Sequence, residues 1–278
     1  MKICIAGKSY ISVEALLYTI EKYGKSNVCI CPNRGDDGIH DWQPSLKKIA
    51  KNNNIKIIEL ENLYDLKNLV FISLEFDRLI KVDKFKTDKL YNIHFSSLPA
   101  YKGVYTSAIP ILNNENQTGV TLHKIDQGID TGDIIDQINF KININETAFS
   151  LYLNYNKNAF NLFKKNLNDI VNLNYTLVSQ SAINSSYYGR SCIDYKNLPL
   201  DLNKTAYEIN SQIRAYNFRA YQMAKIDKKR ISHCQISSEK STTIKREIIK
   251  EEKNCLLFSS IDFNIIMFKD PLNRLIEY

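Results

Sequence analysis

One amide, one imidazole and one carboxylate of this chain have a spacing that would let them act together. Asn92 and His94 lie two positions apart in residues 91–95, whose alternating pattern is typical of a β-strand, so both side chains point to one face. Asp130 lies in the loop after a second predicted strand, 119–125. Because ligands of such sheets gather at strand ends, we expect the three side chains to meet at one edge of the sheet.

These groups suit the transfer of an acyl group to an amine. A protonated His94 can stabilise the negative oxygen that develops when the amine attacks a carbonyl carbon, and the Asn92 amide can donate a second hydrogen bond to it. Asp130 can orient the imidazole, raise its pKa and help proton movement. Gly128 and Gly132 flank Asp130 and allow the backbone to turn tightly. The incoming amine is itself the nucleophile, so no Ser or Cys nucleophile is needed.

The surrounding sequence extends this pattern. It contains Asn92-x-His94, then Leu98-Pro99, Tyr101-Lys102-Gly103, Gly119-Val120-Thr121 and the run Asp-Thr-Gly-Asp-Ile-Ile at 130–135. The pattern resembles the formyltransferases that use N10-formyltetrahydrofolate, specifically over residues 69–142 and more weakly over 1–60. The resemblance implies that Asn92, His94 and Asp130 are the catalytic trio and that N10-formyltetrahydrofolate donates the formyl group.

The same resemblance implies two segments that hold the folate. One follows the apolar stretch 69–74, and the other leads into Asp130. Both are expected to offer backbone groups to the pterin ring and apolar side chains to the walls around it. The residues concerned are Phe76, Asp77, Arg78, Leu79, Ile80, Ile125, Asp126, Gln127 and Gly128.

The composition is that of an ordinary globular protein. The 278 residues are 44% hydrophobic and 24% charged. No apolar run approaches the roughly 20 residues that a membrane span needs, and the apolar stretch 3–6 is too short for a signal peptide. The six cysteines lack the spacing of a metal site. We therefore expect a cytoplasmic protein with free thiols, no bound metal and no membrane contact.

The first part of the chain alternates predicted strands and helices. The strands are predicted at 2–6, 27–32, 55–60 and 69–74. The helices are predicted at 13–23 and 45–53, with a long helix within 145–173. This order predicts an α/β fold in which residues 1–184 form a catalytic domain with a parallel, Rossmann-like sheet.

Residues 185–278 are predicted to form a smaller, β-rich domain. Its elements are a helix at 205–216 and β segments at 221–226, 231–236, 247–251, 255–258 and 265–268. So small a domain buries little apolar surface alone, while Leu256, Phe258, Ile266 and Phe268 give its strands apolar faces. We therefore expect this domain to build a homodimer; packing of these faces onto the first domain is the alternative.

The identity of the acceptor amine is narrowed by charge and by departures from the family pattern. A net charge of +7 permits an anionic partner, but residues 180–184 carry no Lys or Arg, so nucleic acid is not expected. Residues 95–97 differ from the purine and initiator-tRNA members, and residues 104–106 differ from the tRNA-directed members. Chain length and the short C-terminal part resemble the enzymes that formylate nucleotide-linked amino sugars of lipopolysaccharide O-antigens.

The expected acceptor is therefore a dTDP-linked amino-dideoxyhexose, with dTDP-4-amino-4,6-dideoxyglucose favoured. The alternatives are a dTDP-3-amino-3,6-dideoxyhexose, then methionyl-tRNA, then a noncatalytic binding module of the same fold.

A nucleotide diphosphate needs a positive, donor-rich surface. Gly7-Lys8-Ser9-Tyr10 follows the first predicted strand and offers backbone N–H groups, a hydroxyl and a cation; a plain strand-to-helix turn explains the same residues. Lys102 is the single lysine in the loop after Pro99. The candidate substrate-binding residues are Lys8, Ser9, Tyr10, Lys102, Arg190, Arg214 and Tyr221.

Overall fold

The computed structural model describes residues 1–196, 198–241 and 247–272. The chain divides into two compact units, each made of segments that are separate in the sequence. The first unit consists of Met1–Gly103, Thr118–Phe140 and Asn154–Tyr188. The second unit consists of Val104–Gln117, Lys141–Leu153 and Gly189–Tyr278. The last change of unit follows Tyr188, near the predicted boundary after residue 184, and the roles expected of the two domains stay predictions.

The first unit is built on a seven-stranded sheet with the order β3-β2-β1-β4-β5-β7-β8. Its strands are β1 (Lys2–Gly7), β2 (Val28–Pro32), β3 (Lys56–Ile57), β4 (Leu69–Leu74), β5 (Leu90–His94), β7 (Gln117–Lys124) and β8 (Ile134–Lys141). β1 to β5 pair in parallel, which confirms the predicted Rossmann-like core. The strand order reverses between β1 and β4, the position at which such sheets bind ligands.

The far edge of this sheet corrects the predicted all-parallel arrangement. β7 pairs antiparallel with β5. Parallel pairing needs a crossover, usually a helix on the face of the sheet. The connection from β5 to β7 carries only β6 (Lys102–Gly103) and the short helix α4 (Ile109–Leu112), which belongs to the second unit. The sequence does not predict β8, because its residues are partly or fully exposed throughout and give no clear alternation.

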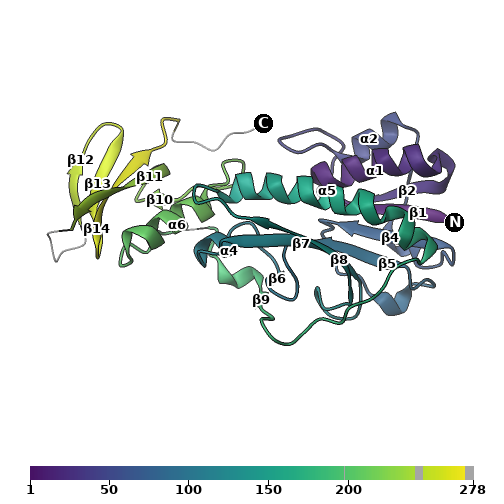
Figure 1. Ribbon diagram of the computed structural model, residues 1–278. Helices are drawn as coiled ribbons and strands as arrows, with labels where there is room; N and C mark the ends of the chain where they lie inside the picture. The colour runs from purple at the N-terminus through teal and green to yellow at the C-terminus, as the bar shows by residue number, and fades with distance from the viewer. Residues whose placement is uncertain (197, 242–246, 273–278) are drawn as a thin grey trace. The chain divides into compact units, whose positions relative to one another are not determined.

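Two helices cover one face of the sheet (Figure 1). They are α1 (Ser9–Tyr23) and the long α5 (Ala148–Asn172), whose residues from Asn154 onward belong to the first unit. The Tyr18 ring of α1 meets the Phe160 ring of α5 edge to face at 6.2 Å. The buried Asn156 amide oxygen accepts a hydrogen bond of 3.1 Å from the Ile11 N–H, which locks the two helices together. α2 (Leu46–Asn52) packs beside α1.

A second hydrophobic cluster contains the buried thiols Cys4, Cys29 and Cys31 together with Phe71. α3 (Leu60–Leu63) packs into this cluster through Leu60 and Leu63, so the apolar end of the predicted strand 55–60 is the start of a helix. All six cysteines are free. Short 3-10 turns occur at Lys25–Asn27, Val82–Lys84 and Arg190–Cys192.

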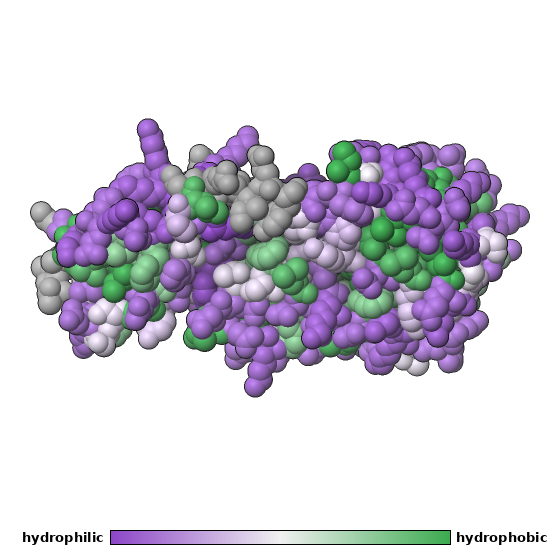
Figure 2. All heavy atoms as spheres, turned by 90° about the horizontal axis from the view of Figure 1, so that it is seen from above, coloured by the Kyte–Doolittle hydropathy of each residue, from purple (hydrophilic) through white to green (hydrophobic). Residues whose placement is uncertain are grey.

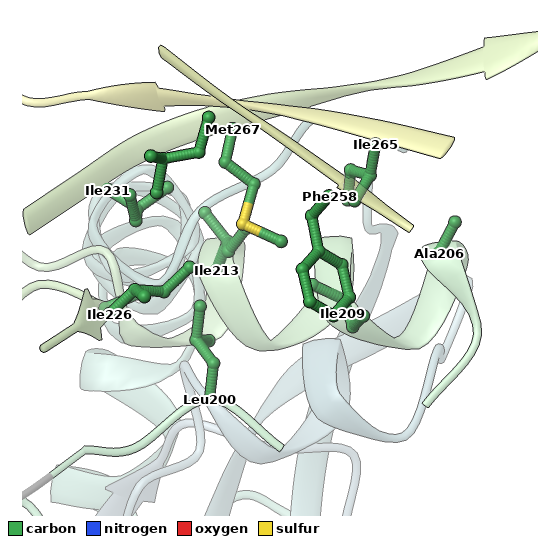
Figure 3. Packing of buried hydrophobic residues seen from close by; sticks show 11 residues of the cluster. Leu200, Ala206, Ile209, Ile213, Ile226, Ile231, Phe258, Ile265 and Met267 are labelled. Atoms are coloured by element: carbon green, nitrogen blue, oxygen red, sulfur yellow. The ribbon is translucent and has the colours of Figure 1, made fainter. Parts of the chain in front are cut away.

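The second unit contains a five-stranded antiparallel sheet with the order β10-β11-β14-β13-β12. Its strands are β10 (Lys225–Ile226), β11 (Lys229–Lys240), β12 (Ile248–Glu251), β13 (Cys255–Ser259) and β14 (Phe263–Lys269). α6 (Ala206–Tyr216) begins at a capping box made by Thr205 and Glu208. Ile209 and Ile213 of α6 pack against the sheet (Figure 3). This unit confirms the predicted β-rich C-terminal part.

The two faces of this sheet are unequal. Leu256 and Phe258 are fully buried in the cluster beneath α6, so they are not available to a partner. Ile266 pairs with Leu257, and Phe268 pairs with Cys255, so these residues lie on the opposite face of the sheet from the buried ones. Ile266 and Phe268 are only half-buried. The homodimer stays a prediction. Its interface would be formed by the face of the sheet that carries Ile266 and Phe268.

Among the residues that the structure describes, no helix is long and apolar enough to cross a membrane. On the face drawn in Figure 2, hydrophilic residues predominate and hydrophobic residues form small separate groups.

The packing of β1 against β4 predicts that Gly7→Ala destabilises the protein. Gly7 has φ +149, and a Cβ there would lie 1.8 Å from the Leu74 carbonyl oxygen. We expect the free energy of unfolding to fall by about 2–5 kcal/mol, from backbone strain and overpacking together. Gly35 has no atom within 4 Å of its built Cβ, so Gly35→Ala is the matched control. Urea unfolding measures both; equal stability of the two variants would contradict the prediction.

Candidate active site

β5 presents Asn92 and His94 on one face, as the alternation predicts. Tyr91 and Ile93 point the other way and are buried, and the Tyr91 hydroxyl lies 2.9 Å from that of Tyr175. His94 is also buried, while Asn92 is half-buried.

Asp130 reaches these residues from an unexpected direction. Because β7 runs antiparallel to β5, its last residue, Lys124, lies opposite Tyr91 at the start of β5. The loop that follows must therefore turn back along β5 to bring Asp130 to His94. The Asp130 Oδ2 atom lies 3.5 Å from His94 Nδ1. The predicted trio of Asn92, His94 and Asp130 is thus brought together, but not by parallel strand ends.

The glycines around Asp130 act by close approach rather than by unusual backbone angles. Asp130 itself adopts φ +55, whereas neither Gly128 nor Gly132 has a positive φ. A Cβ on Gly132 would lie 1.9 Å from the Lys124 carbonyl oxygen, and one on Gly128 would lie 2.0 Å from Thr131 Oγ1. The turn is tight, as predicted, and the left-handed residue is the aspartate.

The Asp130 carboxylate accepts hydrogen bonds from two elements, β5 and β6. The Gly103 N–H of β6 donates to Oδ2 at 2.9 Å. The Asn92 amide donates to Oδ1 at 3.4 Å, a long hydrogen bond. His94 uses its other nitrogen, Nε2, to donate to the Tyr101 carbonyl at 2.8 Å. The backbone of residues 101–103 therefore contacts both His94 and Asp130.

His123 is a site residue that the sequence does not reveal. It lies directly across from Asn92 in the pairing of β5 and β7. Its Nε2 is 3.1 Å from the Asn92 amide nitrogen and 3.7 Å from Asp130 Oδ1. Alternation within 119–125 puts His123 and Thr121 on one face, but only the register with β5 shows that this face is the one of Asn92.

The hydrogen-bond partners define which ring nitrogens carry protons. His123 Nδ1 lies 2.7 Å from the Lys124 carbonyl, which can only accept, so Nδ1 carries the proton and Nε2 accepts from Asn92. His94 Nε2 likewise carries a proton toward the Tyr101 carbonyl. In its neutral form, His94 therefore has its lone pair at Nδ1, on the side of Asp130.

Burial and pairing with neighbouring groups together set the charge states of this group. Burial lowers the pKa of His94 below its ordinary value of 6.5, although Asp130 and the Tyr101 carbonyl favour the charged ring. Burial alone would raise the pKa of Asp130, but the neighbouring histidines and the Gly103 N–H lower it to about 2. At neutral pH the site therefore holds a carboxylate beside an imidazole that is free to take up a proton.

The two predicted folate segments lie on one hydrophobic cluster. Phe76, Ile80 and Ile125 are all partly buried and pack against the cluster that contains Phe71 and Leu90. The structure thus brings together segments that are about 45 positions apart in sequence and leaves apolar side chains along both, as apolar ring binding requires.

Other residues of these segments hold the loops in shape. The Arg78 guanidinium donates to the Pro32 carbonyl at 3.0 Å and lies 4.5 Å from the centre of the Phe76 ring. The Asp77 carboxylate accepts from the Arg34 N–H at 2.9 Å. Leu79 is 74% exposed, and Gln127 is also exposed.

The loop of Asp126 and Gly128 is closed on itself. Asp126 Oδ1 accepts from the Gly128 N–H at 3.0 Å and from the Thr131 hydroxyl at 2.7 Å. These bonds form a compact turn immediately before Asp130.

The predicted phosphate segment after β1 faces acidic groups. The Ser9 hydroxyl donates to the Glu75 carboxylate, and Lys8 Nζ lies 3.7 Å from Asp41 Oδ2. The Tyr10 hydroxyl donates to a backbone carbonyl at 3.1 Å. An anion bound at this segment would therefore meet negative charge, so binding by Lys8, Ser9 and Tyr10 stays a prediction without support from their contacts.

Lys102 lies between the two residues whose backbones touch the trio. Its side chain is largely buried, and Nζ donates to the Ser185 hydroxyl at 2.8 Å. Within the described part of the chain, no carboxylate forms an ion pair with it. A buried cation paired only with a hydroxyl is suited to bind an anionic ligand.

The remaining predicted substrate residues belong to the second unit. Arg190 is exposed at the start of a 3-10 turn. The Arg214 guanidinium donates to the Glu146 carbonyl at 3.1 Å. Tyr221 is 55% exposed, and its ring stacks on Phe218 at 5.3 Å. Their contacts with a substrate stay predictions.

Among the described residues, no group of three or more His, Cys, Asp and Glu side chains could hold a metal ion.

Comparison with known sequences places a family match over the site. Residues 59–167 match the family described as formyl transferase. The methionyl-tRNA formyltransferase of Fervidobacterium nodosum is 29% identical over 229 residues, which are 78% of this chain and 72% of that protein.

Two solved structures are more similar. An N-formyltransferase from Helicobacter canadensis, in complex with folinic acid and dTDP-3-aminofucose, is 47% identical; the match has a TM-score of 0.90 and covers 97% of this chain and 100% of that one. WlaRD, a sugar 3N-formyl transferase in the presence of dTDP and 5-N-formyl-THF, is 46% identical; the match has a TM-score of 0.90 and covers 98% of each chain.

The charge balance in the site predicts how His94 titrates. Burial lowers the pKa of His94 and Asp130 raises it, so we expect a value below 6.5 in the natural protein and a still lower one in Asp130→Asn. The chain has four histidines, so ring signals in NMR spectra can be assigned by comparison with His94→Asn. A higher pKa in Asp130→Asn than in the natural protein would show that the carboxylate does not act on this ring.

Proposed function

We propose that this chain, which belongs to the formyl transferase family, transfers a formyl group from N10-formyltetrahydrofolate to the amine of a dTDP-linked amino sugar. The observation that carries the proposal is the convergence of Asn92, His94 and His123 on the largely buried Asp130 carboxylate. The 47% identity to a formyltransferase in complex with a reduced folate and a dTDP-amino sugar supports the choice of both substrates.

The amine of the acceptor is on carbon 3 of the sugar. The sequence alone favours carbon 4, with carbon 3 as the alternative. The two solved structures that are 46–47% identical and cover nearly the whole chain are described with a 3-amino sugar or as a 3N-formyl transferase, which supports the alternative. A role in O-antigen biosynthesis and a homodimer belong to the same proposal.

The folate binds between the segments 76–80 and 125–128. N10-Formyltetrahydrofolate brings the formyl group to be transferred. Phe76, Ile80 and Ile125 supply apolar contacts from one shared cluster, which fits the bicyclic pterin ring of a reduced folate. Arg78 holds the first segment against Pro32 and stacks on Phe76, so the wall of the site keeps its shape.

His94 takes up the proton that the amine loses when it attacks the formyl carbon, and it returns a proton to N10 when the bond between N10 and the formyl carbon breaks and tetrahydrofolate leaves. Its lowered pKa keeps the ring neutral at pH 7, and its lone pair is at Nδ1. Once protonated, the ring has an acceptor at each nitrogen, the Tyr101 carbonyl and Asp130. Asp130 therefore stabilises the charged form without taking the proton, and the positive charge lies beside the oxygen that becomes negative.

Asn92 supplies a hydrogen bond to that oxygen. One of its N–H groups is fixed on His123 at 3.1 Å. The other makes the long contact of 3.4 Å with Asp130 and is the weaker of the two. A substrate oxygen replaces this weaker contact, while His123 keeps the amide in orientation.

Lys102 is the first-unit residue best suited to the diphosphate, because its buried ammonium group has Ser185 as its hydrogen-bond partner and no ion pair among the described residues.

The acceptor is tested with purified protein, N10-formyltetrahydrofolate and three amines. We expect kcat/KM for a dTDP-3-amino-3,6-dideoxyhexose to exceed that for dTDP-4-amino-4,6-dideoxyglucose by about 10-fold or more, since the attacking nitrogen must reach one fixed position. Initiator methionyl-tRNA is the third amine. Preference for the 4-amino sugar would move the proposal to carbon 4, and formylation of the tRNA alone would reject a sugar substrate.

The proton-transfer role of His94 predicts a large loss of turnover in His94→Asn. We expect kcat to fall by on the order of 100-fold or more, with folding unchanged by circular dichroism. Asp130→Asn should also lower kcat steeply. His233, exposed on β11, gives the matched control His233→Asn, which should retain activity. Near-normal turnover of His94→Asn would exclude the mechanism.

A further inference from the structure

We infer that Gln180 is a positioning residue that holds Asp130 in its working conformation; the inference rests on the proposed formyl transfer. Gln180 lies 50 positions from Asp130 in the sequence, in the segment that leads out of the first unit. It belongs to none of the motifs that point to the site.

Both hydrogens of the Gln180 amide are used on the loop of Asp130. Nε2 donates to the Asp130 carbonyl at 2.9 Å and to the Gly132 carbonyl at 2.8 Å. The two carbonyls flank Thr131, so one side chain spans the turn. Among the described residues, the buried Oε1 of Gln180 has no hydrogen-bond partner, so the amide is oriented for its nitrogen.

This support matters because the conformation of Asp130 is a costly one. Asp130 has φ +55, a region that residues other than glycine rarely adopt. Without the two hydrogen bonds, the backbone of the turn can relax toward common angles. The carboxylate would then move away from His94 Nδ1. The present distance of 3.5 Å is already longer than a hydrogen bond, so this contact does not hold the carboxylate in place.

The same chain segment also holds the carboxylate end of Asp130. We call residues 178–188 the crossing segment; it includes β9 (Tyr187–Tyr188), which pairs in parallel with β6. A Cβ on Gly103 would lie 2.2 Å from the Tyr188 carbonyl, so β9 fixes the position of the Gly103 N–H. That N–H donates to Asp130 Oδ2 at 2.9 Å.

Further contacts tie the crossing segment to the site at both of its ends. Val178 exchanges two backbone hydrogen bonds with Ile134, at 2.8 and 2.9 Å, just after the Asp130 loop. The Tyr101 N–H donates to the Ser186 hydroxyl at 2.8 Å, and it is the Tyr101 carbonyl that accepts from His94. The crossing segment therefore makes hydrogen bonds with the loop that follows His94 and with the loop that contains Asp130. Gln180 is the residue of this segment whose side chain donates to the Asp130 backbone.

The test uses two substitutions and a control. Gln180→Met keeps the length and bulk of the side chain and removes both donors. Gln180→Glu keeps the shape and puts a carboxylate oxygen against two carbonyl oxygens. Ser179→Ala changes the exposed neighbouring residue, whose side chain makes no hydrogen bond with the residues that the structure describes. We expect kcat in the order natural protein and Ser179→Ala, then Gln180→Met, then Gln180→Glu.

Gln180→Met should lower kcat by up to about 100-fold, the effect of a displacement of about 1 Å in a reacting group, with little change in the KM for folate or acceptor. The second readout is the NMR titration of His94 without substrates. If Asp130 moves away, the pKa of His94 falls from its natural value toward that of Asp130→Asn.

The outcomes separate positioning from mere folding. A Gln180→Met protein with reduced stability but natural kcat and a natural His94 titration would overturn the inference. So would a folded variant in which the KM values change and kcat does not. Since the His94 titration needs no substrate, it supports or rejects the inference even if the acceptor or the donor proves to be a different molecule.

Discussion

The largely buried carboxylate of Asp130 organises the elements of the first unit around it. An ionised group largely removed from water is costly unless polar groups surround it. The Asp130 carboxylate accepts hydrogen bonds from Asn92 of β5 and from the Gly103 N–H of β6, and the rings of His94 and His123 lie 3.5 and 3.7 Å from its oxygens. Each donor fixes one element of the sheet or its loops relative to the others. The antiparallel course of β7, the pairing of β6 with β9 and the tight turn at Gly132 all help to bring these groups to one point. The charge that the proposed chemistry uses is therefore also a structural restraint.

The charge states of the site follow from a competition between burial and pairing. Burial wins for His94, whose pKa is lowered, and pairing wins for Asp130, whose pKa is about 2. The result is an ion beside a neutral ring instead of an ion pair. The neutral ring can accept one more proton, and an attacking amine has one proton to lose.

Local sequence patterns made much of the fold, and the shared face of Asn92 and His94, predictable from sequence. The strand alternation that puts Asn92 and His94 on one face needs only neighbouring residues, and the order of strands and helices gives the Rossmann-like core. The parts that sequence did not reveal depend on distant residues. His123 joins the site through its register with Asn92, and Gln180 joins it across 50 positions. The left-handed angle of Asp130 is unexpected because two glycines stand nearby and neither has a positive φ.

The contact between Ser9 and Glu75 has a consequence for what this sheet can hold. Helix α1 begins at Ser9, at the reversal of strand order between β1 and β4, where Rossmann sheets usually receive the phosphates of a dinucleotide. Here a side chain of the protein supplies the negative charge that a helix start attracts. The positive end of the α1 dipole is thereby compensated by a carboxylate of the protein itself. The chain keeps the topology of a dinucleotide fold but has a carboxylate of its own at the customary phosphate position, and the proposed catalytic trio lies farther along the sheet, on β5 and in the loop after β7.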